Sequence, residues 1–182
     1  NGADGDRVFT GTVVLSQVDA PDFVTKNNLK VGASSITLDK VPNTLKPEDE
    51  VLVVTIQGNS NTKNAVGQHE FARVKAIIGL TITLGQGLKN SYDGSKNKVV
   101  VQRVPNYKNV TVSANALVTA LAWNGSKGGI VAFRTQDKLT VAANGRIDVS
   151  YLGYRQGNGS GKHSYGQQGE GIAGPGGFNH VQ

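Results

Sequence analysis

Apolar residues recur at an eight-residue interval between residues 131 and 149. Each repeat has two apolar residues separated by one position, in two series: Val131, Leu139 and Ile147, and Phe133, Val141 and Val149. Side chains two residues apart lie on one face of a strand, so each repeat predicts a short strand with both apolar residues directed inward. The polar segments 135–138 and 143–146 predict turns. The interval is typical of an antiparallel meander or of a parallel β-solenoid, and we favour the solenoid.

The first part of the chain also consists of strand-like runs. They fall at residues 8–15, 34–38, 51–57, 68–74, 75–80, 81–84 and 98–104. The run at 51–57 is almost continuously apolar, which predicts burial of both faces of that strand. Gly79 separates two apolar runs and predicts a hairpin. Pro42 and Pro47 exclude their segment from the centre of a sheet.

From Gly153 onward the chain is rich in glycine and has few aliphatic side chains, so this segment cannot form a core of its own. It is either a flexible linker or an ordered loop packed along a solenoid or a neighbouring subunit. The predicted fold class is all-β: a small β-barrel, then a short parallel β-solenoid-like region and a glycine-rich tail. We place the barrel-like domain at residues 1–108, the solenoid-like repeats at 109–155 and the glycine-rich segment at 156–182.

The amino-acid composition excludes some kinds of chemical site and limits the candidate partners. The 182 residues include no Cys and no Met, which excludes disulfides, thiolate nucleophiles and sulfur ligands for metals. The net charge of +6 favours a polyanionic partner, such as nucleic acid, acidic polysaccharide, anionic lipid or a mineral surface. The basic residues are scattered without a dense block, which is equally typical of an ordinary solvated surface. A basic helix and exposed aromatics on a basic strand are both missing from the pattern, so nucleic acid ranks last. No apolar run approaches the ~20 residues that cross a bilayer, so we expect no membrane insertion.

Several short motifs resemble a small β-barrel module found in secreted and phage-associated β-helix proteins. They are Ile36-Thr37-Leu38, the run from Glu48 to Val53, the E-x-x-x-V motif from Glu70 to Val74, Thr81-Ile82-Thr83-Leu84 and the strand from Tyr92 to Val100. The chain departs from the pattern at Glu48, where Gly is usual. The segments 101–107, 123–126 and 128–133 are similar to the head region of large, glycine-rich secreted surface or matrix proteins. The resemblance implies architecture and specifies function poorly.

Few residues suggest catalysis. His69 adjoins Glu70, but neighbours on a strand point to opposite faces, and the E-x-x-x-V motif implies that Glu70 hydrogen-bonds a loop. His163 and His180 lie far apart in the glycine-rich tail. The start NGADGD resembles part of a calcium loop without its terminal Glu, so we expect a turn there. The glycine-rich GEGIAGPGG lacks the Lys-Ser/Thr ending of a phosphate-binding loop.

One set of charged residues matches the types that β-helix polysaccharide lyases and hydrolases use, namely Arg134, Asp137, Arg146, Asp148 and Arg155. A cleft that holds several sugars needs many stacked coils, and this chain has one or two. We therefore expect these charges to form surface pairs worth less than ~1 kcal/mol each. We predict no catalytic residue, no cofactor and no metal site.

Three sequons could accept N-glycans on a secretory route that installs them. They begin at Asn109, Asn124 and Asn158 and lie beside predicted turns. This placement is consistent with an extracellular protein.

The leading hypothesis is a noncatalytic structural module, secreted or at the cell surface, within a surface, fibre or matrix assembly. An uncapped solenoid leaves sheet edges that pair with another chain, so we expect a homo-oligomer or polymer. A polyanionic glycan or a mineral surface is a further candidate partner. The first alternative is an adhesive or carbohydrate-binding module, and the second is a polysaccharide-cleaving β-helix enzyme.

Overall fold

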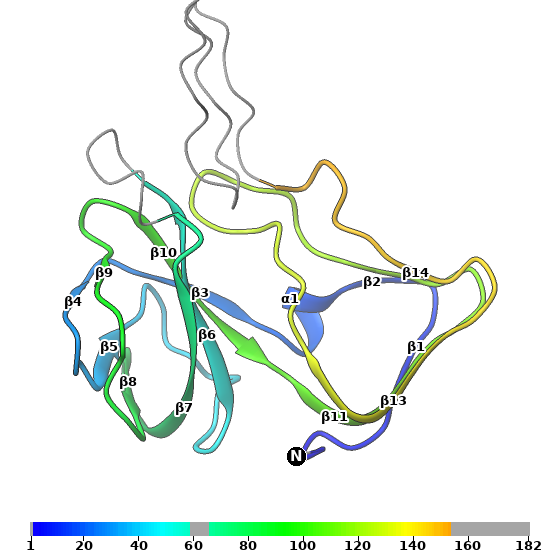
Figure 1. Ribbon diagram of the computed structural model, residues 1–182, viewed down its shortest axis with the longest axis horizontal. Helices are drawn as coiled ribbons and strands as arrows, with labels where there is room; N and C mark the ends of the chain where they lie inside the picture. The colour runs from blue at the N-terminus through cyan, green and yellow to red at the C-terminus, as the bar shows by residue number, and fades with distance from the viewer. Residues whose placement is uncertain (1, 59–65, 154–182) are drawn as a thin grey trace, which may run out of the picture.

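The computed structural model describes residues 2–58 and 66–153 and is almost entirely β-structure, as predicted. It has two lobes, a curled antiparallel sheet and a triangular stack of coils (Figure 1). The described residues include one short helix, α1 (Leu15–Val18). No helix among them is long and apolar enough to span a membrane.

The coils form a short parallel β-solenoid. One face consists of β1 (Arg7–Phe9), β11 (Asn106–Val112) and β13 (Arg134–Val141), paired in parallel in that order. The second face consists of β2 (Thr12–Val14), β12 (Leu117–Thr119) and β14 (Arg146–Ile147), also parallel, with β12 in the middle. The parallel pairing confirms the solenoid-like region and rules out the meander.

The strands of the last coil differ from the eight-residue pattern. Residues 135–138, predicted as a turn, continue β13, and residues 131–133 are not a strand. The reason is tertiary: β11 offers a long partner, and parallel pairing along it extends β13 through the polar segment despite a bulge between Tyr107 and Asn109. The turn predicted at residues 143–146 is present around Asn144, which has a φ of 59°.

The other lobe is the barrel-like sheet. It contains β3 (Asp22–Thr25), β5 (Ser35–Thr37), β6 (Glu50–Gln57), β7 (His69–Ile78), β8 (Thr81–Leu84) and β10 (Lys98–Val104). The order is β3-β10-β6-β7-β8-β5, all antiparallel, and a separate pair joins β4 (Asn28–Leu29) to β9 (Tyr92–Asp93). Hydrogen bonds between Val24 and Asp39 link the two ends of the curled sheet. Gly79, with a φ of 57°, makes the predicted hairpin between β7 and β8.

The barrel lies within the first coil of the solenoid. Strand β1 pairs with β11, and β2 pairs with β12. The chain between β2 and β11 forms the whole barrel. The boundary expected at residue 108 groups residues 7–14 with the barrel, whereas their pairing places them in the solenoid. A pairing partner about a hundred residues away leaves no local mark in the sequence, which is why the strand pattern alone does not show it.

Each lobe has its own core. The barrel core includes Phe23, Val53, Tyr92 and Val101, and the solenoid core includes Phe9, Leu15, Tyr107, Val110, Val112 and Val118. Strand β6 has buried residues on both faces, as its continuous apolar run predicts. Strand β10 is also buried from Val99 to Val104, and its residues Val99 and Val101 belong to the barrel core.

The apolar residues predicted to stack inward are only partly covered. Val131 and Phe133 pack against the solenoid core. Leu139, Val141, Ile147 and Val149, by contrast, are 46%, 46%, 39% and 38% exposed. Val141 is in register with the buried Val112 and Phe9. The apolar residues of the last coil therefore stack in register with buried residues, as predicted. They are not themselves buried, because no further described coil covers β13.

Candidate functional site

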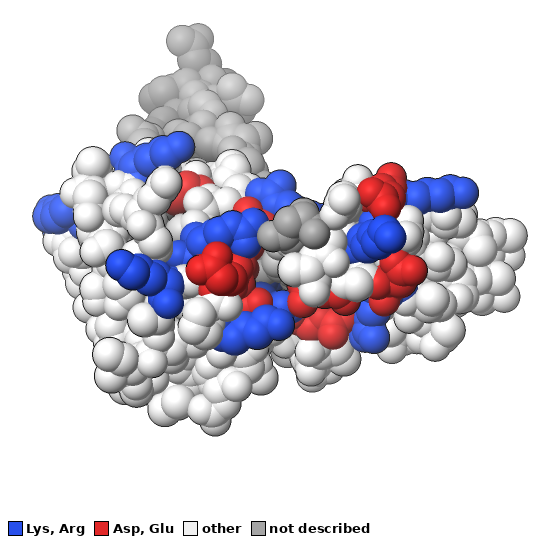
Figure 2. All heavy atoms as spheres, turned by 90° about the horizontal axis from the view of Figure 1, so that it is seen from below, with Lys and Arg blue, Asp and Glu red and all other residues white. Residues whose placement is uncertain are grey.

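A hollow lies where the barrel meets the first coil of the solenoid. It has a volume of about 320 Å³, and its lining is Ala3, Asp4, Lys46, Pro47, Glu48, Asp49, Glu50, Arg73, Val104 and Asn106. Figure 2 shows acidic and basic side chains gathered along the line between the two lobes. The hollow is thus lined largely by charged side chains where the two lobes meet.

Arg103 is the centre of the charge network behind this hollow. Its Nη2 lies 2.6 Å from Asp4 Oδ1 and 2.9 Å from Asp49 Oδ1, and its Nη1 donates to the Asp19 carbonyl at 2.9 Å. Arg103 and Asp49 are both buried. Burial alone would lower the pKa of Arg103, but the hydrogen bonds to the two carboxylates outweigh it and raise the pKa. The guanidinium therefore ties the amino-terminal turn and α1 to the barrel.

The carboxylate of Asp4 is held at the same place. Its Oδ2 accepts a hydrogen bond of 2.7 Å from the backbone N–H of Asn106, where β11 begins. Partial burial would raise the pKa of Asp4, but this bond and the contact with Arg103 outweigh burial, so the pKa lies below its ordinary value of 3.8. The turn expected in NGADGD is present, since Gly5 N–H donates to Gly2 carbonyl at 3.0 Å. Asp4 and Asp6 both bind β11, the latter through Asn109.

A second ion pair joins the lobes at the surface. Arg134 donates through Nε and Nη2 to Glu50, at 2.6 Å and 2.9 Å, and its guanidinium lies 4.5 Å from the ring centroid of Phe71. Burial would raise the pKa of Glu50, but hydrogen bonds from Arg134 and Asn106 outweigh it and lower the pKa. Arg134 therefore serves as a link between β13 and the barrel.

Glu48 has a strained backbone. Its φ is 72°, in the left-handed region that glycine adopts without steric cost. The Arg73 guanidinium donates to its carbonyl at 2.9 Å, which helps to hold this conformation. The side chain is exposed, and no hydrogen bond or ion pair of its carboxylate is found among the described residues. Glycine would adopt the same backbone conformation at this position without the steric cost of a Cβ.

The predicted role of Glu70 is confirmed. Its two carboxylate oxygens accept hydrogen bonds from the backbone N–H groups of Lys89 and Asn90, at 2.8 Å and 3.0 Å. The adjacent His69 is exposed and contacts the Gly67 carbonyl through Nδ1 at 2.9 Å. The two neighbours therefore serve separate local contacts, and they do not form an acid and base pair.

The charges of the solenoid do not gather into one site. Arg134 begins β13, whereas Arg146 and Asp148 belong to the β14 segment on another face. The latter two form a surface pair at 4.0 Å, in line with the expected surface pairs. Asp148 caps a turn by accepting a hydrogen bond from the Ser150 backbone N–H. Hydrogen bonds from Ser150 lower the pKa of the Asp148 carboxyl. Asp137 is exposed on β13. Arg155, His163 and His180 lie outside the described residues.

Two of the three sequons fall in the described part. The side chain of Asn109, on β11, donates to Asp6 at 2.9 Å. Asn124 lies in an exposed turn, where its Oδ1 accepts hydrogen bonds from the backbone N–H groups of Ser126 and Lys127. Asn158 lies outside the described residues. Glycosylation at Asn109 and Asn124 stays a prediction.

The third coil forms an open end of the solenoid. Leu139, Val141 and Ile147 occupy inward columns whose members in the second coil, Val110, Val112 and Val118, are buried. Strands β13 and β14 are edge strands of their sheets. At the opposite end Phe9 and Leu15 are completely buried, and α1 lies within the outline of the coils in Figure 1. The two ends therefore differ in the burial of their apolar side chains, whereas the outermost described strands, β1 and β2 at one end and β13 and β14 at the other, are all edge strands.

Sequence reasoning missed the junction network. Its signal was a pair of polar residues, Gln102 and Arg103, within an otherwise apolar strand. A buried charge needs a partner, so such an arginine predicts a carboxylate nearby. Its partners Asp4 and Asp49 are distant in sequence, and only the fold brings them together. Within residues 2–58 and 66–153, no group of three or more His, Asp or Glu is placed to hold a metal ion.

Comparison with known proteins gives distant structural neighbours only. No protein-family model matches the chain, and no curated protein matches it. The tailspike gp61 of Pseudomonas phage phi297 matches at a TM-score of 0.40 and 20% identity, over 74% of this chain and 24% of that one. The tailspike gp49 of Pseudomonas phage LKA1 matches at 0.33 and 22% identity, over 69% and 22%.

A third solved structure is the tailspike Gp54 of the Acinetobacter baumannii phage AP22, in complex with A. baumannii capsular saccharide. It matches at a TM-score of 0.39 and 12% identity, over 75% of this chain and 23% of that one. The chain thus spans about a quarter of the length of each of these tailspikes.

Proposed function

We propose that this chain is a noncatalytic, extracellular structural module that joins a surface, fibre or matrix assembly through the open end of its solenoid. The carrying observation is the asymmetry of the two ends. At one end Phe9 and Leu15 are completely buried and Val13 is partly buried, whereas at the other end Leu139, Val141, Ile147 and Val149 are 38–46% exposed. Adding strands to β13 and β14 would cover them and pair the free edges.

The occupant that fits best is a second copy of the chain. A copy brings the same half-exposed aliphatic residues and the same edge strands, so two open ends can bury each other. The charged side chains of the last coil are of both signs, including Arg146 and Asp148, so a self-complementary contact need not bring like charges together. This contact would give a homo-oligomer that is closed as a dimer, because it uses the open ends of both copies.

The contacts of the charged residues support a noncatalytic role. Arg134 is neutralised by Glu50, Arg103 by Asp4 and Asp49, and Asp148 caps a turn. Each of these groups is already engaged by a structural partner within the chain, so its charge is not free to act on a substrate. The alternative of a polysaccharide-cleaving enzyme predicts release of reducing or unsaturated ends from acidic polysaccharides by the purified chain.

Sedimentation velocity over a range of concentrations tests the proposal. We expect the chain to associate and the variant Leu139→Asp/Val141→Asp to remain monomeric, because two carboxylates at the open end oppose apolar contact. The matched control is Val8→Asp/Val18→Asp, which changes two exposed valines, 58% and 53% exposed, away from the open end. Circular dichroism would verify that both variants fold.

The control variant should associate like the original chain. A chain that sediments as a monomer at every concentration would overturn the proposal. Equal loss of association in both variants would also overturn it, because the contact would then not be specific to the open end.

A further inference from the structure

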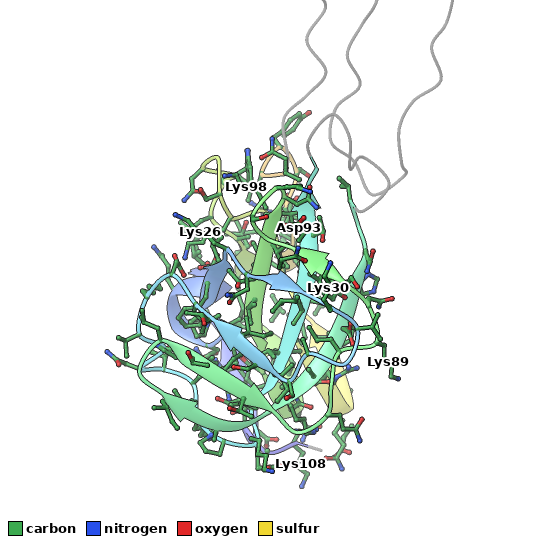
Figure 3. All side chains as sticks on the ribbon, turned by 90° about the vertical axis from the view of Figure 1, so that its left-hand side faces the viewer. Lys26, Lys30, Lys89, Asp93, Lys98 and Lys108 are labelled. Atoms are coloured by element: carbon green, nitrogen blue, oxygen red, sulfur yellow. The ribbon has the colours of Figure 1, made fainter. Side chains whose placement is uncertain are left out.

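Five exposed lysines lie together on the outer side of the barrel. They are Lys26, Lys30, Lys89, Lys96 and Lys98, here called the lysine face. They come from three neighbouring connections: the β3–β4–β5 region, the β8–β9 loop and the turn before β10. Figure 3 shows Lys26 and Lys98 near Asp93, Lys30 beside them and Lys89 further along the same side. Backbone pairing of β4 with β9 joins the first and last of these connections.

The carboxylates near the lysine face are already engaged. Asp93 accepts hydrogen bonds from the backbone and hydroxyl of Ser95 and lies 3.6 Å from Lys96 Nζ. Glu70 is hydrogen-bonded to the backbone N–H groups of Lys89 and Asn90. No described carboxylate pairs with Lys26, Lys30, Lys89 or Lys98. The face therefore retains a local excess of positive charge.

The backbone beneath the lysine face is closely packed. A Cβ on Gly94 would lie 2.3 Å from the Thr25 carbonyl oxygen, and one on Gly87 would lie 2.6 Å from that of Gly32. Gly94 N–H donates to the Asn27 carbonyl at 2.8 Å, and Asn27 Oδ1 accepts from the Thr37 backbone at 2.7 Å. Such contacts leave the loops little freedom to move apart. Binding there would order only the lysine side chains, which reduces its entropic cost.

We propose that the lysine face binds an acidic polysaccharide, a role that goes beyond the structural module. Lysine is a compact point charge on a flexible stem, which suits carboxylates spaced along a chain of sugars. Exposed Asn28, Ser91 and Ser95 lie among the lysines and can exchange hydrogen bonds with sugar hydroxyls. The face thus offers cations for the carboxylates and neutral polar groups for the hydroxyls of a uronic acid polymer.

The composition of the face argues against a nucleic acid in the same place. Single strands are bound largely by stacking on exposed aromatic rings, and Tyr92, the aromatic residue of β9, is completely buried. Arginine makes the commonest specific contacts with bases in duplex DNA, and the lysine face contains no arginine. Lysine alone is consistent with a ligand that is recognised by charge and hydroxyl groups.

Titration of fluorescein-labelled oligogalacturonate, followed by anisotropy, tests the inference. The face variant is Lys26→Gln/Lys98→Gln, and the control is Lys75→Gln/Lys108→Gln. Both remove two charges from exposed lysines outside the open end of the solenoid, and Figure 3 shows Lys108 far from Lys98. We expect the face variant to bind at least about tenfold more weakly and the control to change by less than about threefold. Neutral dextran should not compete with the labelled ligand.

Three outcomes would overturn the inference. The first is absence of measurable binding by the original chain, and the second is an equal loss in the two variants, which would indicate unspecific charge attraction. The third is tighter binding of duplex DNA or phosphatidylserine vesicles than of oligogalacturonate, lost in the same face variant. Because the face and control variants both keep the open end of the solenoid, association by sedimentation is unaffected in either, and the two proposals fail or succeed separately.

Discussion

At the scale of single residues, several positions share a positive φ but differ in how well their side chains tolerate it. Glu48, Asn115 and Asn144 all have a positive φ, at 72°, 58° and 59°. Asparagine tolerates this region because its short side chain hydrogen-bonds locally, whereas glutamate gains nothing comparable. Glu48, like Tyr151 with its φ of 62°, is therefore a residue whose backbone would be relieved by substitution with glycine.

Glu48→Gly is expected to stabilise the protein by about 1 kcal/mol, because glycine adopts a left-handed φ without the clash of a Cβ. Thermal unfolding followed by circular dichroism would show this as a rise in Tm of several degrees. Asn115→Gly is the matched control and should change Tm much less. If Glu48→Gly lowered Tm, the glutamate side chain would have to make a stabilising contact that offsets the strain.

At the scale of elements, position along the solenoid decides how much an inward side chain is buried. Val112 in the second coil is completely buried, and its neighbour in register on β13, Val141, is 46% exposed. The eight-residue pattern treats every repeat as equivalent. Real coils differ because only the inner ones have neighbours on both sides.

Val112→Asp should therefore cost more than Val141→Asp in the free energy of unfolding, by about 2 kcal/mol or more. The first substitution buries a carboxylate among apolar side chains, while the second leaves it in contact with water. Urea unfolding of the two variants at a concentration where the chain is monomeric measures the difference. Equal losses would mean that the open end is covered in solution even in the monomer.

At the scale of the whole molecule, ion pairs hold the inserted barrel against the solenoid. Asp4 and Arg134 belong to the solenoid, and their partners Arg103 and Glu50 belong to barrel strands. The two chain crossings into and out of the barrel lie beside this network, near Asp22 and Val104. The junction is thus a shared element of both lobes, and we expect them to unfold together.

This network makes stability depend on pH. The pKa values of Asp4 and Glu50 are lowered in the folded state from ordinary values of 3.8 and 4.5. A carboxyl with a lowered folded pKa stabilises the fold above its unfolded pKa and loses that contribution as the pH falls through the folded value. The free energy of unfolding should therefore decrease from about pH 5 downward.

Urea unfolding at a series of pH values checks this expectation. The variant Asp4→Asn/Glu50→Gln should be less stable at neutral pH and should lose less stability on acidification. Asp137→Asn, an exposed carboxylate on β13, should keep the slope of the original chain. A slope that is the same in all three proteins would show that the junction carboxylates do not govern the acid response.

Local patterns in the sequence determined the fold class, the solenoid, the hairpin at Gly79 and the role of Glu70. Alternating apolar residues and a glycine between two runs act over a few positions, so they can be recognised without the fold. Burial of β6 on both faces was predictable for the same reason. The role of Glu70 was implied by the resembled E-x-x-x-V motif, since its partners Lys89 and Asn90 lie 19 and 20 residues further along the chain.

Only the tertiary structure decided which strands meet. The pairing of β1 with β11 places the barrel within a coil, the length of β11 extends β13 through a predicted turn, and the junction network unites Asp4, Asp49 and Arg103. The exposure of Val141 likewise depends on the absence of a further described coil beyond β13. The physical reason is that these features depend on contacts between segments far apart in sequence, and the local hydrophobic pattern is compatible with several such pairings.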